Sequence, residues 1–244
     1  MLNEKAVKNP PKKKDNLPVD PLENIGLSAE QIKEVVQASG TNLIVKIIPA
    51  LDKFLGWIDY ADQKIREQKL NNLLNVFISK FESTDKALKQ IGELFRNRAG
   101  IILFQKIIQI IDNSSADDEW LNILANVLKN ISNDDFVKHF EAKDYVLAQI
   151  SKLTPQALII INKHDIWKQA HIQNTTTTSG QTASGDWSEQ ITMFLRSKVG
   201  ITDLHTGARI NHSFRELESA GLIKLTGHEL KFTAIGLEIR NLTQ

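Results

Sequence analysis

The sequence predicts a mainly α-helical protein, in which an N-terminal helical domain precedes a C-terminal winged helix with one β-hairpin. Two observations predict this fold class. Apolar residues recur at helical spacing through most of the chain, and near its end a glycine-containing turn separates two short alternating segments. We expect a helical domain over 22–142 and a winged-helix-like domain over 143–244. A flexible, threonine-rich insertion at 173–186 and a disordered basic tail at 1–21 complete the organisation.

The composition is that of an ordinary globular protein. Of the 244 residues, 41% are hydrophobic and 24% are charged, and the formal net charge of +1 argues against general binding of polyanions. The absence of cysteine excludes disulfides and thiol catalysis. No apolar run follows the lysine-rich start, so we expect a cytoplasmic protein. The most apolar stretch, 101–111, is shorter than the roughly 20 residues of a spanning helix, so we expect no integral membrane insertion.

Helices are expected through most of the first two thirds of the chain. Ser28 and Gln31 form a capping box at the start of the first helix, because each side chain can satisfy a backbone N–H at the helix start. A second helix is expected over 41–48, and a long, mostly helical segment follows over 51–80.

Three further helices contribute the predicted core. Ser83 or Thr84 is expected to cap a helix that ends near Gly100, and the apolar run 101–111 predicts a buried helix. The next helix starts at 115–118, where acidic side chains favour the positive end of the helix dipole. Its predicted buried stripe consists of Trp120, Leu121, Leu124, Val127, Leu128 and Ile131.

The second domain begins with a helix whose start is well marked. A short helix is expected over 145–150. Thr154 is then expected at the N-cap and Pro155 at the first helical position. Proline suits that position because a backbone N–H there would have no partner within the helix. This helix runs to about residue 163. Another helix is expected over 187–198, beyond the insertion.

The hairpin is the most specific prediction. Gly227 suits the first central position of a type II′ turn, since glycine takes a positive φ there without a Cβ clash. A two-residue loop fixes the register, which places apolar residues on one face and polar residues on the other. The predicted pairs are Ile223–Phe232, Lys224–Lys231 and Leu225–Leu230. Because an isolated hairpin is marginal in water, its apolar face must dock on the preceding helix.

The helix before the hairpin has an apolar stripe of Ile210, Phe214 and Leu217 and ends at Gly221. Its polar side and the hairpin lysines predict a surface for nucleic acid or a protein partner. The candidate contact residues are Arg209, Asn211, His212, Arg215, Lys224 and Lys231. Residues 185–244 carry as many acidic as basic side chains, so protein contact, or a purely structural role, stays open beside nucleic-acid binding.

Two parts of the chain together resemble a known family. The first comprises the leucine- and alanine-rich segment 120–130 and the segment 145–157, which ends in Leu-Thr-Pro-Gln-Ala. The second comprises Leu-Glu-Ser-Ala-Gly-Leu-Ile at 217–223 and Phe-Thr-Ala-Ile-Gly at 232–236. With these motifs the chain resembles the bacterial Abi-alpha family, which is linked by name to abortive infection. The resemblance implies a role in defence against phage, and it offers no catalytic residues to carry over.

The sequence carries no recognisable motif for catalysis. The six histidines lack the i, i+4 spacing of a zinc helix, and no phosphate-binding glycine loop or serine elbow is present. Helix capping accounts for the acidic runs at 117–119 and 134–135. We therefore expect a non-enzymatic binding protein without metal or cofactor. The alternatives are an assembly subunit that meets a protein partner or its own copy through the helical domain, and a toxin effector of unrecognised type.

Overall fold

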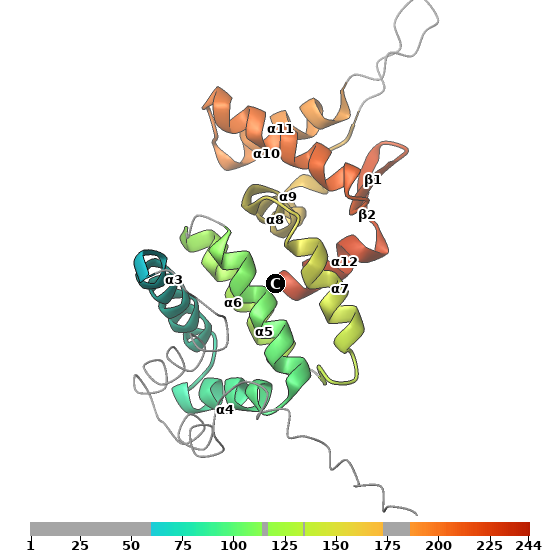
Figure 1. Ribbon diagram of the computed structural model, residues 1–244. Coiled ribbons are helices and arrows are strands. Elements are labelled where there is room, and N and C mark those ends of the chain that lie inside the picture. Colours follow the sequence, from blue (N-terminus) through green and yellow to red (C-terminus); the bar gives the residue numbers. More distant parts are fainter. Residues whose placement is uncertain (1–59, 114–116, 134, 173–185) are drawn as a thin grey trace, which may run out of the picture.

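The computed structural model describes residues 60–113, 117–133, 135–172 and 186–244. This part of the chain is mainly helical and contains one antiparallel hairpin, as the sequence predicts (Figure 1). The elements are α3 (Tyr60–Ser79), α4 (Thr84–Phe95), α5 (Arg98–Asp112), α6 (Asp118–Asn133), α7 (Phe140–Ile150), α8 (Pro155–Asn162), α9 (His164–Trp167), α10 (Trp187–Val199), α11 (Leu204–Ser219), β1 (Ile223–Thr226), β2 (Glu229–Phe232) and α12 (Ala234–Thr243). The helices expected before residue 51, the tail at 1–21 and the insertion up to residue 185 lie outside the described residues.

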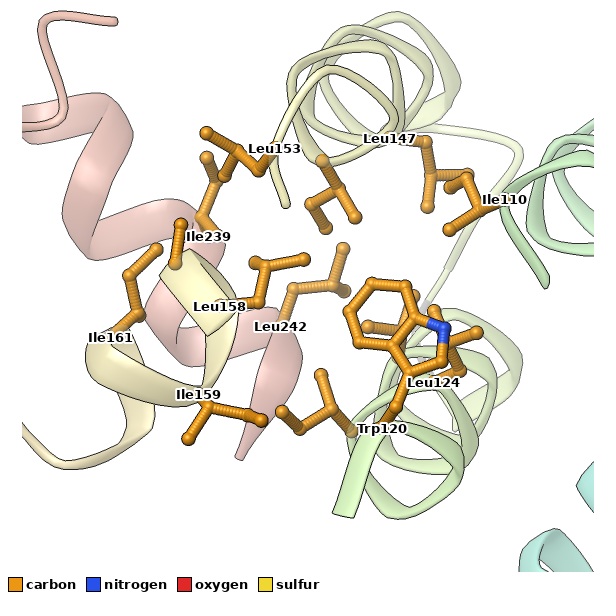
Figure 2. Packing of buried hydrophobic residues seen from close by; sticks show 14 of the residues in the cluster. Ile110, Trp120, Leu124, Leu147, Leu153, Leu158, Ile159, Ile161, Ile239 and Leu242 are labelled. Carbon is orange, nitrogen blue, oxygen red and sulfur yellow. The ribbon is translucent and has the colours of Figure 1, made fainter. Parts of the chain in front are cut away.

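One apolar core runs through the described part of the molecule. It extends from Leu70 in α3 to Leu242 in α12. Figure 2 shows Trp120 of α6, Leu158 of α8 and Ile239 of α12 packed around one centre. The core therefore continues across the expected boundary between residues 142 and 143, and the division into two domains stays a prediction.

The C-terminal helix is held inside this core. In Figure 1 the C-terminus lies at the centre of the molecule, and α12 packs against α6 and α7. The side-chain amide of Asn126 donates to the carbonyl of Thr243 at 3.0 Å, and that of Asn130 donates to the carbonyl of Leu242 at 3.0 Å. These α6 side chains satisfy carbonyls that the end of a helix leaves unpaired.

The helices α5 and α6 form as the sequence predicts. The run 101–111 lies within α5, where most of its apolar side chains are buried. All six residues of the predicted α6 stripe are buried as well. The Asp117 carboxylate accepts a hydrogen bond from the backbone N–H of Trp120 at 2.7 Å, which is the capping role expected for this acidic run.

The predicted end of the helix before α5 is wrong. α4 ends at Phe95, and Gly100 lies in the first turn of α5, which Asn97 caps by accepting from the N–H of Ala99 at 2.9 Å. A Cβ at Gly100 would lie 2.1 Å from the carbonyl oxygen of Leu94. The glycine therefore allows a close crossing of two helices and does not end either of them.

The start of α8 is as predicted, and the helix gains a second anchor. The Thr154 hydroxyl accepts from the N–H of Ala157 at 3.2 Å, and Pro155 occupies the first turn. The Glu216 carboxylate of α11 accepts from the Thr154 backbone N–H and from its hydroxyl, both at 2.7 Å. α7 begins at Phe140, five residues earlier than expected, and the short helix α9 was not predicted.

Candidate nucleic-acid interface

The apolar stripe of α11 seats this helix on its neighbours. Ile210, Phe214 and Leu217 are buried, and α11 packs against α8 and α10. Phe214 meets Trp167 edge to face, with ring centroids 6.0 Å apart, and Trp187 with centroids 6.5 Å apart. The predicted stripe is confirmed, and the side of α11 opposite to it is left at the surface.

A glycine turn directs the chain from α11 into the hairpin. Gly221 has a φ of 68°, and its N–H donates to the carbonyl of Glu218 at 2.8 Å. The N–H of Leu222 donates to the carbonyl of Leu217 at 2.9 Å. These two hydrogen bonds form a Schellman motif, which ends the helix where the sequence predicted and fixes the direction of β1.

The hairpin has the predicted register. Ile223 pairs with Phe232, Leu225 with Leu230, and the pair Lys224–Lys231 lies on the polar face. Gly227 has a φ of 64°, while no non-glycine residue in the described part of the chain has a positive φ. A type I′ turn needs two positive φ angles and a type II′ turn needs one, so the turn fits type II′.

The apolar face of the hairpin docks on an aromatic cluster. The Phe232 ring lies 5.3 Å from the Trp167 ring and 4.8 Å from the His164 ring, measured between centroids. At the turn itself, the N–H of Ile172 donates to the carbonyl of His228 at 3.0 Å. Nδ1 of His228 lies 2.9 Å from the carbonyl oxygen of Ile172. The chain before the insertion therefore braces the tip of the hairpin.

A threonine and a glycine fix the far end of the hairpin to α12. The Thr233 hydroxyl donates to the carbonyl of Gly221 at 2.7 Å and accepts from the N–H of Gly236 at 3.2 Å. A Cβ at Gly236 would lie 2.0 Å from the carbonyl oxygen of Leu222. The Thr-Ala-Ile-Gly pattern thus combines a helix N-cap with a close approach of two backbones.

The structure brings three of the candidate contact residues to the outer face of α11. Arg209, His212 and Arg215 are exposed and follow one another at intervals of three residues. The guanidinium of Arg209 donates to the Thr206 hydroxyl at 3.1 Å. That of Arg215 forms an ion pair with Asp186, the residue that caps α10.

The other three candidates differ in their surroundings. Lys224 and Lys231 are exposed on the polar face of the hairpin, and the Lys231 ammonium lies 2.9 Å from the Glu229 carboxylate. Asn211 is half-buried, and its side-chain oxygen accepts from the Ser188 hydroxyl at 2.8 Å. Asn211 therefore faces α10, and its part in a contact surface stays a prediction.

Two carboxylates balance this surface: Glu229, which the sequence places beside the hairpin lysines, and Asp186, which sequence reasoning missed. Burial raises the pKa of Asp186, but hydrogen bonds from Ser188 and Arg215 outweigh that effect and leave its pKa below the ordinary value. The hydrogen bond from Lys231 lowers the pKa of Glu229. Glu229 and Lys231 are two residues apart in one strand, so the sequence itself indicates that they share a face. Asp186 is far from Arg215 in the sequence, so no pattern indicated that these two residues pair.

Comparison with models of protein families, with curated proteins and with solved structures finds no match to the chain. The resemblance to the Abi-alpha family therefore stays a prediction. Within the described ranges, every helix is too short or too polar to cross a membrane. The same ranges contain no cluster of three or more histidine and acidic side chains arranged to hold a metal ion.

Proposed function

We propose that residues 143–244 form a winged helix that binds duplex nucleic acid through α11 and the β1–β2 hairpin, and that the protein acts by binding without catalysis. The order of elements supports this proposal. α8 and α10 both pack against α11, and the hairpin follows α11 directly. In helix-turn-helix proteins such a helix enters the major groove, and flanking elements contact the backbone.

The observation that carries the proposal is the division of α11 into a buried and a cationic face. Ile210, Phe214 and Leu217 hold one side in the core. On the other side, Arg209 and Arg215 are six residues apart, which is about 1.7 turns and about 9 Å along the helix axis, a spacing suited to contacts along one groove. Guanidinium groups pair with phosphates and with guanine edges, so this face has the chemistry that a duplex requires.

The hairpin lysines add a second contact to the same surface. Lys224 and Lys231 are direct cross-strand partners, and two like charges in that position repel each other. The ion pairs Lys231–Glu229 and Arg215–Asp186 lie at the surface, where such pairs stabilise a fold only weakly, so a phosphate can replace either carboxylate. The protein would then bind a duplex that contacts α11 and the hairpin together more tightly than it binds other polyanions.

Fluorescence anisotropy with a labelled DNA duplex at low salt tests the proposal. We expect Arg209→Ala with His212→Ala to weaken binding by about tenfold or more, because each removes a contact from the outer face of α11. Lys138→Ala is the control, since Lys138 is an exposed lysine in the turn before α7. Undetectable binding of the wild-type protein, or equal affinity for the double variant and the control, would refute the nucleic-acid proposal.

A second candidate function is contact with a protein, and a different observation favours it. Met193 in α10 is 66% exposed, and Leu204 at the start of α11 is 76% exposed. A contiguous patch of exposed apolar side chains marks a partner or self-association site, and Met193 and Leu204 would belong to such a patch. Light scattering after size exclusion, on the wild type and on Met193→Lys with Leu204→Lys, tests this function. An oligomer that the double substitution dissociates would support it, and a wild type that is monomeric at all concentrations would argue against self-association.

The biological setting rests on the family resemblance alone. We propose that binding serves in defence against phage. Expression of the wild-type protein should then lower the plating efficiency of some phages on a bacterial host, and the Arg209→Ala, His212→Ala variant should not. Equal plating with either protein, across phages of several types, would count against this setting.

A further inference from the structure

A second group of cations lies away from the hairpin, where α3 ends and α4 begins beside α6. Figure 1 shows this corner at the opposite end of the molecule from α10 and α11. The corner contains a pocket of about 460 Å³. That volume is within the range of about 300–1,000 Å³ that is typical of small-molecule sites. The pocket is independent of the surface assigned to nucleic acid above.

Three separate segments bring lysines to the pocket. Lys80 follows directly on α3, Lys86 and Lys89 lie in α4, and Lys129 lies in α6. Lys86 and Lys89 are three residues apart, so they share one helical face. Packing of α3 and α4 on α6 therefore gathers charges that are far apart in the sequence.

The pocket has more positive than negative charge. The only carboxylate among its described lining residues is that of Glu82, which forms an ion pair with Lys86. Four ammonium groups against one carboxylate leave three positive charges. Lys80 and Lys129 line the same pocket, and burial, followed by the charge of Lys129, lowers the pKa of Lys80.

The neighbouring groups hold these lysines in place. The Lys80 ammonium donates to the side-chain oxygen of Asn122 at 3.2 Å. The Lys129 ammonium lies 5.6 Å from the centre of the Phe81 ring, which in turn packs on Phe77 with centroids 4.9 Å apart. The negative face of an aromatic ring attracts a cation, so this contact positions the Lys129 ammonium at the pocket.

We propose that this pocket binds the phosphate groups of a small polyphosphate, such as a nucleoside triphosphate. Lys80 and Lys129 would contact the phosphates from the α3 and α6 side, and Lys86 and Lys89 from the α4 side. A bound polyphosphate neutralises the excess charge and removes the repulsion between the lysines. Lining amides such as that of Gln90 add neutral hydrogen-bond donors.

Isothermal titration of the full chain with inorganic triphosphate, and separately with ATP, tests this proposal in buffer without divalent metal. We expect both to bind. Lys80→Gln with Lys129→Gln should weaken binding of both by about tenfold or more, because hydrogen bonds to charged groups are among the stronger polar contacts. Lys86 and Lys89 are exposed on α4, so Lys86→Gln with Lys89→Gln is a second, independent pair that should also weaken binding. Lys138→Gln with Lys152→Gln removes two exposed lysines outside the pocket and should leave binding unchanged.

The two ligands separate the sources of recognition. Equal affinities would show that the phosphates alone are recognised, and tighter binding of ATP would show that the nucleoside also contributes, for example at Phe81. Binding of neither ligand would overturn the proposal. It would also be overturned if both pocket variants, folded by circular dichroism, bound like the wild type, or if the control pair weakened binding equally. The pocket lysines lie outside α11 and the hairpin, so both pocket variants should bind the DNA duplex like the wild type. Failure of triphosphate binding is therefore distinct from failure of duplex binding.

Discussion

Single glycine residues determine how α11, the β1–β2 hairpin and α12 are joined and how closely they approach each other. Gly221 and Gly227 supply the positive φ angles that end α11 and turn the hairpin. Gly236 acts differently, because its role is to leave space for the carbonyl of Leu222. The motif glycines of this region are thus of two physical kinds, which the sequence alone does not distinguish.

Substitution of Gly236 tests whether this glycine is needed to leave space for a neighbouring backbone carbonyl. A Cβ at this position would lie 2.0 Å from a backbone oxygen, so α12 would have to move away from the hairpin. We expect Gly236→Ala to lower the free energy of unfolding by about 1–3 kcal/mol in urea denaturation. Ala234→Ser, an exposed position in the same first turn, should change it little. Unchanged stability of Gly236→Ala would show that the close approach is absent.

His164 makes stability depend on pH. Burial first, and then the charges of Arg240 and Lys168, hold its pKa below the ordinary value of 6.5, although Asp165 opposes them. Its Nδ1 is buried without a hydrogen-bond partner in the described structure. The unfolded chain therefore binds this proton more readily, so the contribution is fully present above pH 6.5 and is lost as the pH falls below that value.

The matching experiment compares thermal melting of the wild type and of His164→Gln between neutral and mildly acidic pH. The wild type should lose stability as the pH falls through 6.5, and the variant should lose less over the same range. The variant also loses the ring contacts with Trp167 and Phe232, so only the slope with pH is diagnostic. Parallel slopes for the two proteins would contradict the assignment.

At the scale of elements, periodicity and caps were predictive wherever local chemistry decides the structure. The stripe of α6, the Thr154-Pro155 start of α8 and the hairpin register followed from spacing and turn chemistry. The α4–α5 boundary was missed because a glycine needed for a helix crossing looks the same in sequence as one that ends a helix. α9 has four residues, too few for a periodic pattern.

The junction between α6 and α12 is an element-scale feature that can be tested. Asn126 and Asn130 donate to the last carbonyls of α12, which would otherwise be unpaired near the core. Asn126→Ala with Asn130→Ala should destabilise the protein by about 1–3 kcal/mol in urea denaturation, the cost of carbonyls left without donors. Asn241→Ala, an exposed asparagine of α12, is the matched control. Equal free energies of unfolding for the double variant and this control would contradict the assignment of Asn126 and Asn130 as caps of α12.

At the scale of the molecule, the last helix, α12, lies at the centre (Figure 1) and packs against α6 and α7. The core runs from Leu70 in α3 to Leu242 in α12, so residues from both ends of the described chain complete it. The sequence predicted the cationic side chains of the candidate interface, since helical spacing assigns them to one face. It could not predict the Arg215–Asp186 pair or the lysine pocket, because both depend on how distant segments pack.

The salt dependence of duplex binding tests the central claim, which is that α11 and the hairpin form one surface for nucleic acid. Anisotropy titrations at several salt concentrations give the slope of log K against log salt, which is about −0.9 for each phosphate contact. Lys224→Ala with Lys231→Ala should reduce the magnitude of this slope by about two such contacts while the protein stays folded. A wild type that shows no binding at low salt, or a double variant with an unchanged slope, would contradict the account.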